Sequence, residues 1–161
     1  PDKCSKADSV IRWYYYLWLH KIDNYDSRRD FLDDKTGEYY QAKIAYYNDI
    51  ERYWKQDFQK LIKSIKKGFR FKILYIFCVN KDGMIIERIY EIPEKEIYDI
   101  ETNKERGSIS IMKYDSNMNL YKNGWYEMYR DKDLGELENV NEIWQRIYEN
   151  KDVIQKFIKW F

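Results

Sequence analysis

The stretch DFLDDKTGEYYQAKIAYY, residues 30–47, contains two runs of strand-forming residues on either side of a polar turn. Gly37 stands in the turn, where it can adopt the positive φ angle that a tight reversal needs. The pattern therefore predicts a β-hairpin that joins a strand over residues 28–32 to a strand over residues 38–47.

The second strand of this hairpin places an amide and an ammonium group side by side. Side chains alternate along a strand, so Gln41 and Lys43 share one face. If the turn is centred between Lys35 and Thr36, Asp30 falls opposite Gln41 and joins that face. Such a set suits phosphodiester hydrolysis, because carboxylate and carbonyl oxygens bind Mg²⁺ and a lysine stabilises developing charge. The alternative interpretation is an ordinary polar face with Lys43 reaching solvent.

Hydrophobic periodicity predicts further elements on both sides of the hairpin. A helix is expected over residues 5–22, and a second helix is expected to begin at Asn48 or Asp49 and to end at Gly68. The apolar stripe of the second helix consists of Ile50, Tyr53, Trp54, Phe58, Leu61, Ile62 and Ile65.

The rest of the chain reads as three strands followed by two helices. The apolar run over residues 69–79 predicts a central strand that is buried on both faces. Shorter strands are expected over residues 84–92 and 108–112, and helices over residues 135–148 and 153–160. The order predicts one α/β domain over residues 1–161, with a single mixed β-sheet flanked by helices. In one alternative, the helices over residues 135–160 are an appendage to that domain.

Charge is unevenly distributed, although the formal total is only +1. Residues 52–72 hold eight basic side chains and a single acid, Asp57. A positive belt of this kind is typical of proteins that bind a phosphate backbone. The candidate nucleic-acid-binding residues are Lys55, Lys60, Lys63, Lys66, Lys67 and Arg70. The alternative interpretation is a solvated helix face.

Several classes of function are disfavoured by the composition. Two cysteines do not make a disulfide framework, and a single histidine, His20, cannot supply a histidine-based metal cluster. The sequence has no phosphate-binding glycine loop, so no nucleotide cofactor is expected. No apolar run approaches the length of a membrane span, so we expect a soluble cytoplasmic protein without a membrane partner.

Four segments together resemble the PD-(D/E)XK nuclease superfamily, in particular its type II restriction-endonuclease-like branch. They are DFLDDKTGEYYQAKIA (30–45), FRFKILYIFCVNKDGMIIERIYEIP (69–93), SISI (108–111) and WYEMYRDKD (125–133). The resemblance extends in loose form over residues 28–147 and implies a restriction-endonuclease-like core. The chemistry that it implies lies in the hairpin.

By this resemblance, Asp30, Gln41 and Lys43 are the catalytic residues. Asp30 and Gln41 would bind Mg²⁺, with Mn²⁺ as a substitute, and Asp33 is the rival for the aspartate position. Gln41 stands where most members carry Asp or Glu, and a neutral amide binds Mg²⁺ more weakly than a carboxylate. An acid from the first helix, Asp8, is a further candidate ligand.

The expected function is therefore Mg²⁺-dependent hydrolysis of double-stranded DNA. A homodimer is expected as well, because cutting both strands of a duplex favours two-fold symmetry. Two alternatives remain open at this point. One is a nucleic-acid-binding module that does not cut. The other is a protein-interaction domain that uses residues 125–129 and the C-terminal Trp160 and Phe161 as anchors.

Overall fold

The computed structural model describes the backbone of residues 24–26 and 30–33, and residues 36–82, 85–130, 145 and 149 in full. The predicted helices over residues 5–22 and 153–160 lie outside this part of the chain, as does the helix over residues 135–148 except for residue 145.

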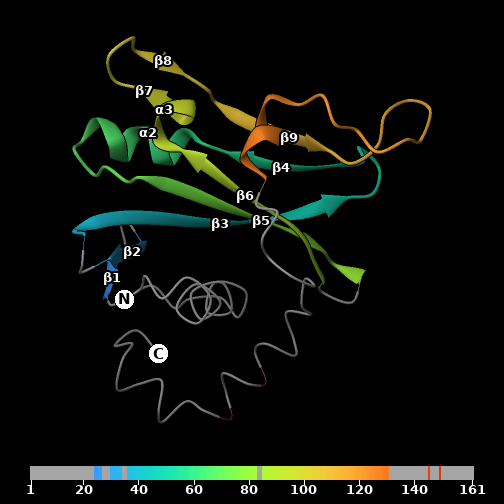
Figure 1. Cartoon of the computed structure of the whole chain (residues 1–161), viewed down its shortest axis with the longest axis horizontal. Helices are drawn as coiled ribbons and strands as arrows, with labels where there is room; N and C mark the ends of the chain where they lie inside the picture. The colour runs from blue at the N-terminus through green and yellow to red at the C-terminus, as the bar shows by residue number, and fades with distance from the viewer. Residues whose placement is uncertain are drawn as a thin grey trace.

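The described part is a mixed α/β fold that is built mainly from strands (Figure 1). The strands are β1 (Asn24–Asp26), β2 (Asp30–Asp33), β3 (Glu38–Asn48), β4 (Tyr53–Asp57), β5 (Ile73–Asn80), β6 (Ile85–Pro93), β7 (Tyr98–Asp99), β8 (Lys104–Glu105) and β9 (Ser108–Met112). The helices are α2 (Gln59–Lys66), α3 (Glu94–Ile97) and the 3₁₀ helix η2 (Trp125–Tyr129). The predicted mixed sheet is confirmed, whereas the restriction-endonuclease-like core stays a prediction.

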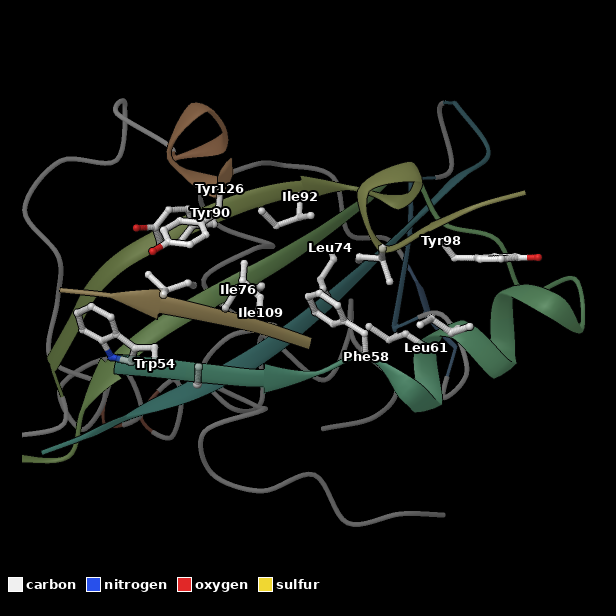
Figure 2. Packing of buried hydrophobic residues seen from close by; sticks show 14 of the residues in the cluster. Trp54, Phe58, Leu61, Leu74, Ile76, Tyr90, Ile92, Tyr98, Ile109 and Tyr126 are labelled. Atoms are coloured by element: carbon white, nitrogen blue, oxygen red, sulfur yellow. The ribbon is translucent and has the colours of Figure 1, made fainter. Parts of the chain in front are cut away.

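Strand β3 is the centre of the sheet. It pairs antiparallel with β2 at its beginning, parallel with β5 along its middle, and antiparallel with β4 at its end. Strand β6 continues the sheet beyond β5, and β9 continues it beyond β4, both antiparallel. The sheet curls, so that β4 and β9 lie across one face of β5 and β6 (Figures 1 and 2).

The β2–β3 turn follows the sequence prediction. Gly37 has a φ angle of 73°, which lies in the left-handed region that glycine adopts without steric cost. The Glu38 amide donates a 3.3 Å hydrogen bond to the Thr36 hydroxyl oxygen and so closes the turn. Residues Asp33 and Glu38 face each other across it, which confirms the predicted turn centre.

The second predicted helix is wrong in its first half. The Asn48 side chain accepts hydrogen bonds of 2.9 Å from the amides of Ile50 and Glu51, and this local turn replaces a helix cap. Arg52 follows with a φ angle of 61°, which reverses the chain direction into β4. A helix forms only over Gln59–Lys66, and Gly68 ends it with a φ angle of 97°.

The hydrophobic core lies inside the curl of the sheet. Strands β3, β5 and β6 line one side of it, and α2, β4 and β9 line the other (Figure 2). Strand β5 is buried from Leu74 to Val79, which confirms the predicted central strand. The Trp54 indole N–H donates a 3.2 Å hydrogen bond to the Val79 carbonyl, so β4 is fixed to β5 across the core. Burial raises the pKa of the Cys78 thiol, so this residue is a small core side chain and not a nucleophile.

Strands β6 and β9 do not pair with each other, so the curled sheet has a gap between them. Helix η2 lies at this gap. The Met112 amide at the end of β9 donates a 2.9 Å hydrogen bond to the Tyr126 hydroxyl oxygen. The Tyr126 ring meets the Tyr90 ring of β6 edge-on, with 5.6 Å between the centroids. Through this one residue, η2 connects the two strands across the gap.

Residues Ile50 and Trp54 provide a test of whether residues 48–57 form a turn and strand β4 and not a helix. A helix over residues 48–67 would place both side chains on one apolar stripe. In the structure, Trp54 is 0% exposed and Ile50 is 91% exposed. We expect Trp54→Ala to lower the free energy of unfolding by about 3–5 kcal/mol. The change Ile50→Ala should alter it by less than about 0.5 kcal/mol. Urea unfolding measures both, and a similar loss for the two variants would contradict the strand assignment.

Candidate metal and nucleic-acid site

The backbone of the β2–β3 hairpin differs from the prediction at one position. Strand β2 contains a bulge, so that Asp30 and Phe31 both face Tyr40. The predicted pairing of Asp30 with Gln41 is therefore wrong by one residue, although the turn centre is right. A bulge inserts one residue into a strand, and bulges are common beside active sites, where they redirect a side chain.

Residues Gln41 and Lys43 share one face of β3, as the alternation predicts. Gln41 pairs with Leu74, and Lys43 pairs with Ile76, both of which belong to the hydrophobic core. Gln41 is only 4% exposed, whereas Lys43 is partly exposed. The core-side face of β3 thus changes from polar at these two residues to apolar at Ala45.

A buried amide on an apolar face has two physical explanations. Burial of a polar group costs free energy unless the group is hydrogen-bonded, so such a side chain either completes an internal network or binds a ligand. Gln41 does take part in contacts within the chain. Its amide oxygen is a hard ligand of the kind that Mg²⁺ accepts.

The described side chains do not complete a metal site by themselves. Within residues 36–82 and 85–130, no three His, Cys, Asp or Glu side chains lie close enough together to hold an ion. The side chains of Asp30 and Asp33, like residue Asp8, fall outside the described part. The described residues therefore offer a single predicted ligand, Gln41, and the metal assignment stays a prediction.

Three of the predicted nucleic-acid-binding lysines form one row on α2 and just beyond its end. Residues Lys60, Lys63 and Lys67 are all exposed, and their spacing of three and four residues places them on one side of the helix. The opposite side carries the buried Leu61, Ile62 and Ile65. We call Lys60, Lys63 and Lys67 the lysine row. Lys55 is exposed on the neighbouring strand β4.

Two other cations of the predicted belt are engaged in ion pairs within the protein. The Lys66 ammonium group donates to the Glu105 carboxylate, which raises the pKa of Lys66, and lies 5.3 Å from the centre of the Tyr98 ring. The Arg70 Nε atom lies 2.8 and 2.9 Å from the two Glu94 carboxylate oxygens. Lys66 and Arg70 are exposed as well, so their ion pairs, and not burial, distinguish them from the lysine row.

The carboxylate of Glu94 has a structural role. Its side chain is 10% exposed, and it accepts a 3.0 Å hydrogen bond from the Phe71 amide as well as the hydrogen bonds from Arg70. The same carboxylate raises the pKa of Arg70. Glu94 thereby connects the segment that leaves α2 to the start of α3.

A polar network that the sequence did not indicate lies beside η2. The Tyr90 hydroxyl donates to the Glu127 carboxylate at 3.1 Å and accepts from the guanidinium groups of Arg88 and Arg130, each at 3.2 Å. Burial raises the pKa of Tyr90 to about 12. The Arg130 Nε atom is buried and has no hydrogen-bond partner. The members of this network come from β6 and from the segment 127–130, so no local pattern could reveal it.

Comparisons with known proteins do not place the chain in a family. Neither a scan against protein-family models, nor a search of curated proteins, nor a search of solved structures finds a match. Within the described residues, no helix is long and apolar enough to cross a membrane.

The raised pKa of Tyr90 predicts a pH dependence of stability. The folded protein holds the Tyr90 proton up to about pH 12, whereas an unfolded tyrosine releases its proton near the ordinary value of 10.0. The contribution of Tyr90 is therefore complete below pH 10 and is lost as the pH rises towards 12. Between these pH values, unfolding free energy should fall more steeply for wild type than for Tyr90→Phe. Equal slopes in urea unfolding would contradict the shift.

Proposed function

We propose that this protein is a Mg²⁺-dependent endonuclease that hydrolyses the phosphodiester backbone of double-stranded DNA. The observation that carries the proposal is the placement of Gln41 and Lys43 two residues apart on the core-side face of β3. The backbone of Asp30 lies in the bulge of β2, which faces Tyr40, the residue before Gln41. An amide oxygen can bind a metal ion and an ammonium group can stabilise charge on a phosphate, so the two groups together support this chemistry.

Each residue has a distinct role in this proposal. The Lys43 ammonium group would stabilise the negative charge that develops on the phosphate during attack by water. The Gln41 amide oxygen and the Asp30 carboxylate would hold the metal ion, with Asp33 as the rival of Asp30. A bound Mg²⁺ would polarise the phosphate and favour deprotonation of a water molecule.

The lysine row supports the choice of a nucleic acid as substrate. Three exposed ammonium groups on one side of a helix match a line of phosphate groups, and displacement of counterions from DNA supplies much of the affinity of such surfaces. The segment that follows the row leads to the start of β5, where the Lys72 amide donates a 2.8 Å hydrogen bond to the Tyr39 carbonyl. The row and the hairpin are therefore linked through a short, hydrogen-bonded segment.

A nucleic-acid-binding module without hydrolysis is the second candidate, and Gln41 favours it. A neutral amide at a position where a carboxylate would bind Mg²⁺ more tightly fits a site that has lost its metal. The third interpretation, a protein-interaction surface at residues 125–129 with Trp160 and Phe161, has less support, and Trp160 and Phe161 lie outside the described residues. Trp125 and Tyr129 pack against the hydrophobic core and are only partly exposed.

Substitution of Lys43 tests the catalytic proposal. Supercoiled plasmid with the wild-type protein and Mg²⁺ or Mn²⁺ should be nicked, and EDTA should stop the reaction. We expect Lys43→Ala to lower the rate by about 100-fold or more, since removal of a donor at developing charge typically has that effect. The matched control Lys95→Ala removes an ammonium group from an exposed position of α3, outside the predicted positive belt, and should retain most of the rate.

A second variant separates a cutting protein from a binding module. The change Gln41→Glu supplies a carboxylate of the same shape, which should lower the Mg²⁺ concentration needed for half-maximal nicking if Gln41 is a ligand. If Gln41 only completes the core, the buried charge should destabilise the protein, and Mg²⁺ should not restore the melting temperature. Salt-sensitive DNA binding without nicking in any variant would favour the binding module.

Binding measurements can distinguish the lysine row from the cations in internal pairs. We expect Lys63→Ala to weaken binding to a DNA duplex and to reduce the slope of log affinity against log salt by about 1. Arg70→Ala should leave that slope unchanged. It should instead lower the free energy of unfolding by about 1–3 kcal/mol, because the Glu94 carboxylate loses its partner. Fluorescence anisotropy and urea unfolding measure the two effects, and a reversed pattern would contradict the assignment.

A further inference from the structure

A small hairpin stands apart from the main sheet. Strands β7 and β8 pair only with each other, through Tyr98 with Glu105 and Asp99 with Lys104. In Figure 1 the hairpin projects from the molecule beside α2 and α3. All four residues of its turn, residues 100–103, are exposed, and so is Lys104.

The hairpin is held in one conformation although its tip adds nothing to the core. The Asp99 carboxylate accepts hydrogen bonds from the Glu101 and Thr102 amides, at 3.0 and 3.4 Å. Asn103 has a φ angle of 57°, and its side-chain oxygen accepts a 2.8 Å hydrogen bond from the Tyr98 hydroxyl. Ordering of an exposed tip costs conformational entropy that no apolar burial at the tip offsets. Because the tip is already ordered by these hydrogen bonds, it would lose little conformational entropy on binding, which suits a recognition element.

Contacts with α2 place the hairpin beside the lysine row. Glu105 and the Tyr98 ring both contact the Lys66 ammonium group. Lys66 lies on the flank of α2, between its buried side and the side that carries Lys63 and Lys67. A duplex that contacts the lysine row would consequently meet the hairpin next.

The hairpin carries three acids and one lysine, and the ion pair between Lys66 and Glu105 reduces its negative charge. Asp99 is engaged by two amides and Glu105 by Lys66, so two of the three acids of this hairpin have internal partners. The remaining charged groups, Glu101 and Lys104, have opposite signs. Residues Thr102 and Lys104 are both exposed.

We propose that the tip of the β7–β8 hairpin enters a groove of the duplex and determines the preferred DNA sequence, with Thr102 and Lys104 contacting base edges. A two-stranded ribbon fits the major groove, where each base pair presents a distinct pattern of donors and acceptors. Contacts with phosphates from the lysine row position the duplex, and contacts with bases then specify its sequence. This inference rests on the proposed binding of double-stranded DNA.

The test is a selection from a pool of DNA duplexes with a randomised centre, performed in EDTA so that nothing is cut. We expect the wild-type protein to enrich a short motif. The double variant Thr102→Ala/Lys104→Ala should lose enrichment at one or more positions, where a wrong base pair ordinarily lowers affinity by about 5- to 150-fold. Its affinity for the unselected pool should stay within about threefold of wild type, because most of that affinity comes from phosphate contacts.

The loop that contains Ser116 and Lys122 provides a matched control. Ser116→Ala/Lys122→Ala removes the same kinds of group from another exposed loop and should leave the motif unchanged. Retention of the full motif by the hairpin variant overturns the inference. Binding of the pool by wild type without any motif also overturns it, while the proposed binding of DNA stands. If wild type does not bind the pool at low salt, the proposed function and this inference fail together.

Discussion

The fold depends on the backbone hydrogen bonds of a single long strand. Strand β3 has 11 residues and pairs with three different strands, β2 at its beginning, β5 along its middle and β4 at its end. The sheet cannot be flat, because β4 turns back and lies across one face of β5 and β6 (Figure 2). The core forms in the space that this curl encloses, and Trp54 reaches across it to the backbone of β5. Gln41 and Lys43 lie in the segment of β3 between its pairing with β2 and its pairing with β4.

Local chemistry explains which elements could be predicted from the sequence. The turn at Gly37 and the buried strand β5 follow from residues that are neighbours in the chain, and the structure confirms both. The helix predicted for the segment before α2 is wrong because Tyr53, Trp54 and Phe58 fit a helical period as well as they fit a strand. The hydrogen bonds of the Asn48 side chain and the positive φ of Arg52 decide between the two, and neither is visible as a hydrophobic pattern.

The candidate site was predictable only where it depends on alternation along one strand. That rule correctly places Gln41 and Lys43 together. It could not foresee the bulge at Asp30, because the bulge depends on how β2 fits between its neighbours. Nor could it foresee that Glu94 and Glu105 engage two of the basic residues from positions 24 and 39 residues further along the chain. Total charge therefore says little about this surface, whereas the partners of each cation show which ones are already paired with a carboxylate.

The hydrogen bond between the Met112 amide and the Tyr126 hydroxyl has a consequence for behaviour in concentrated solution. An edge strand with free amides is a template on which strands of other molecules can add and begin an aggregate. Strand β9 is uncharged and has alternating isoleucines, so its composition offers little resistance to such addition. The Tyr126 hydroxyl occupies the amide at the end of that strand, and η2 is the element that brings it there. The same contact that closes the gap in the sheet thus also shortens the length of edge on which another chain could assemble.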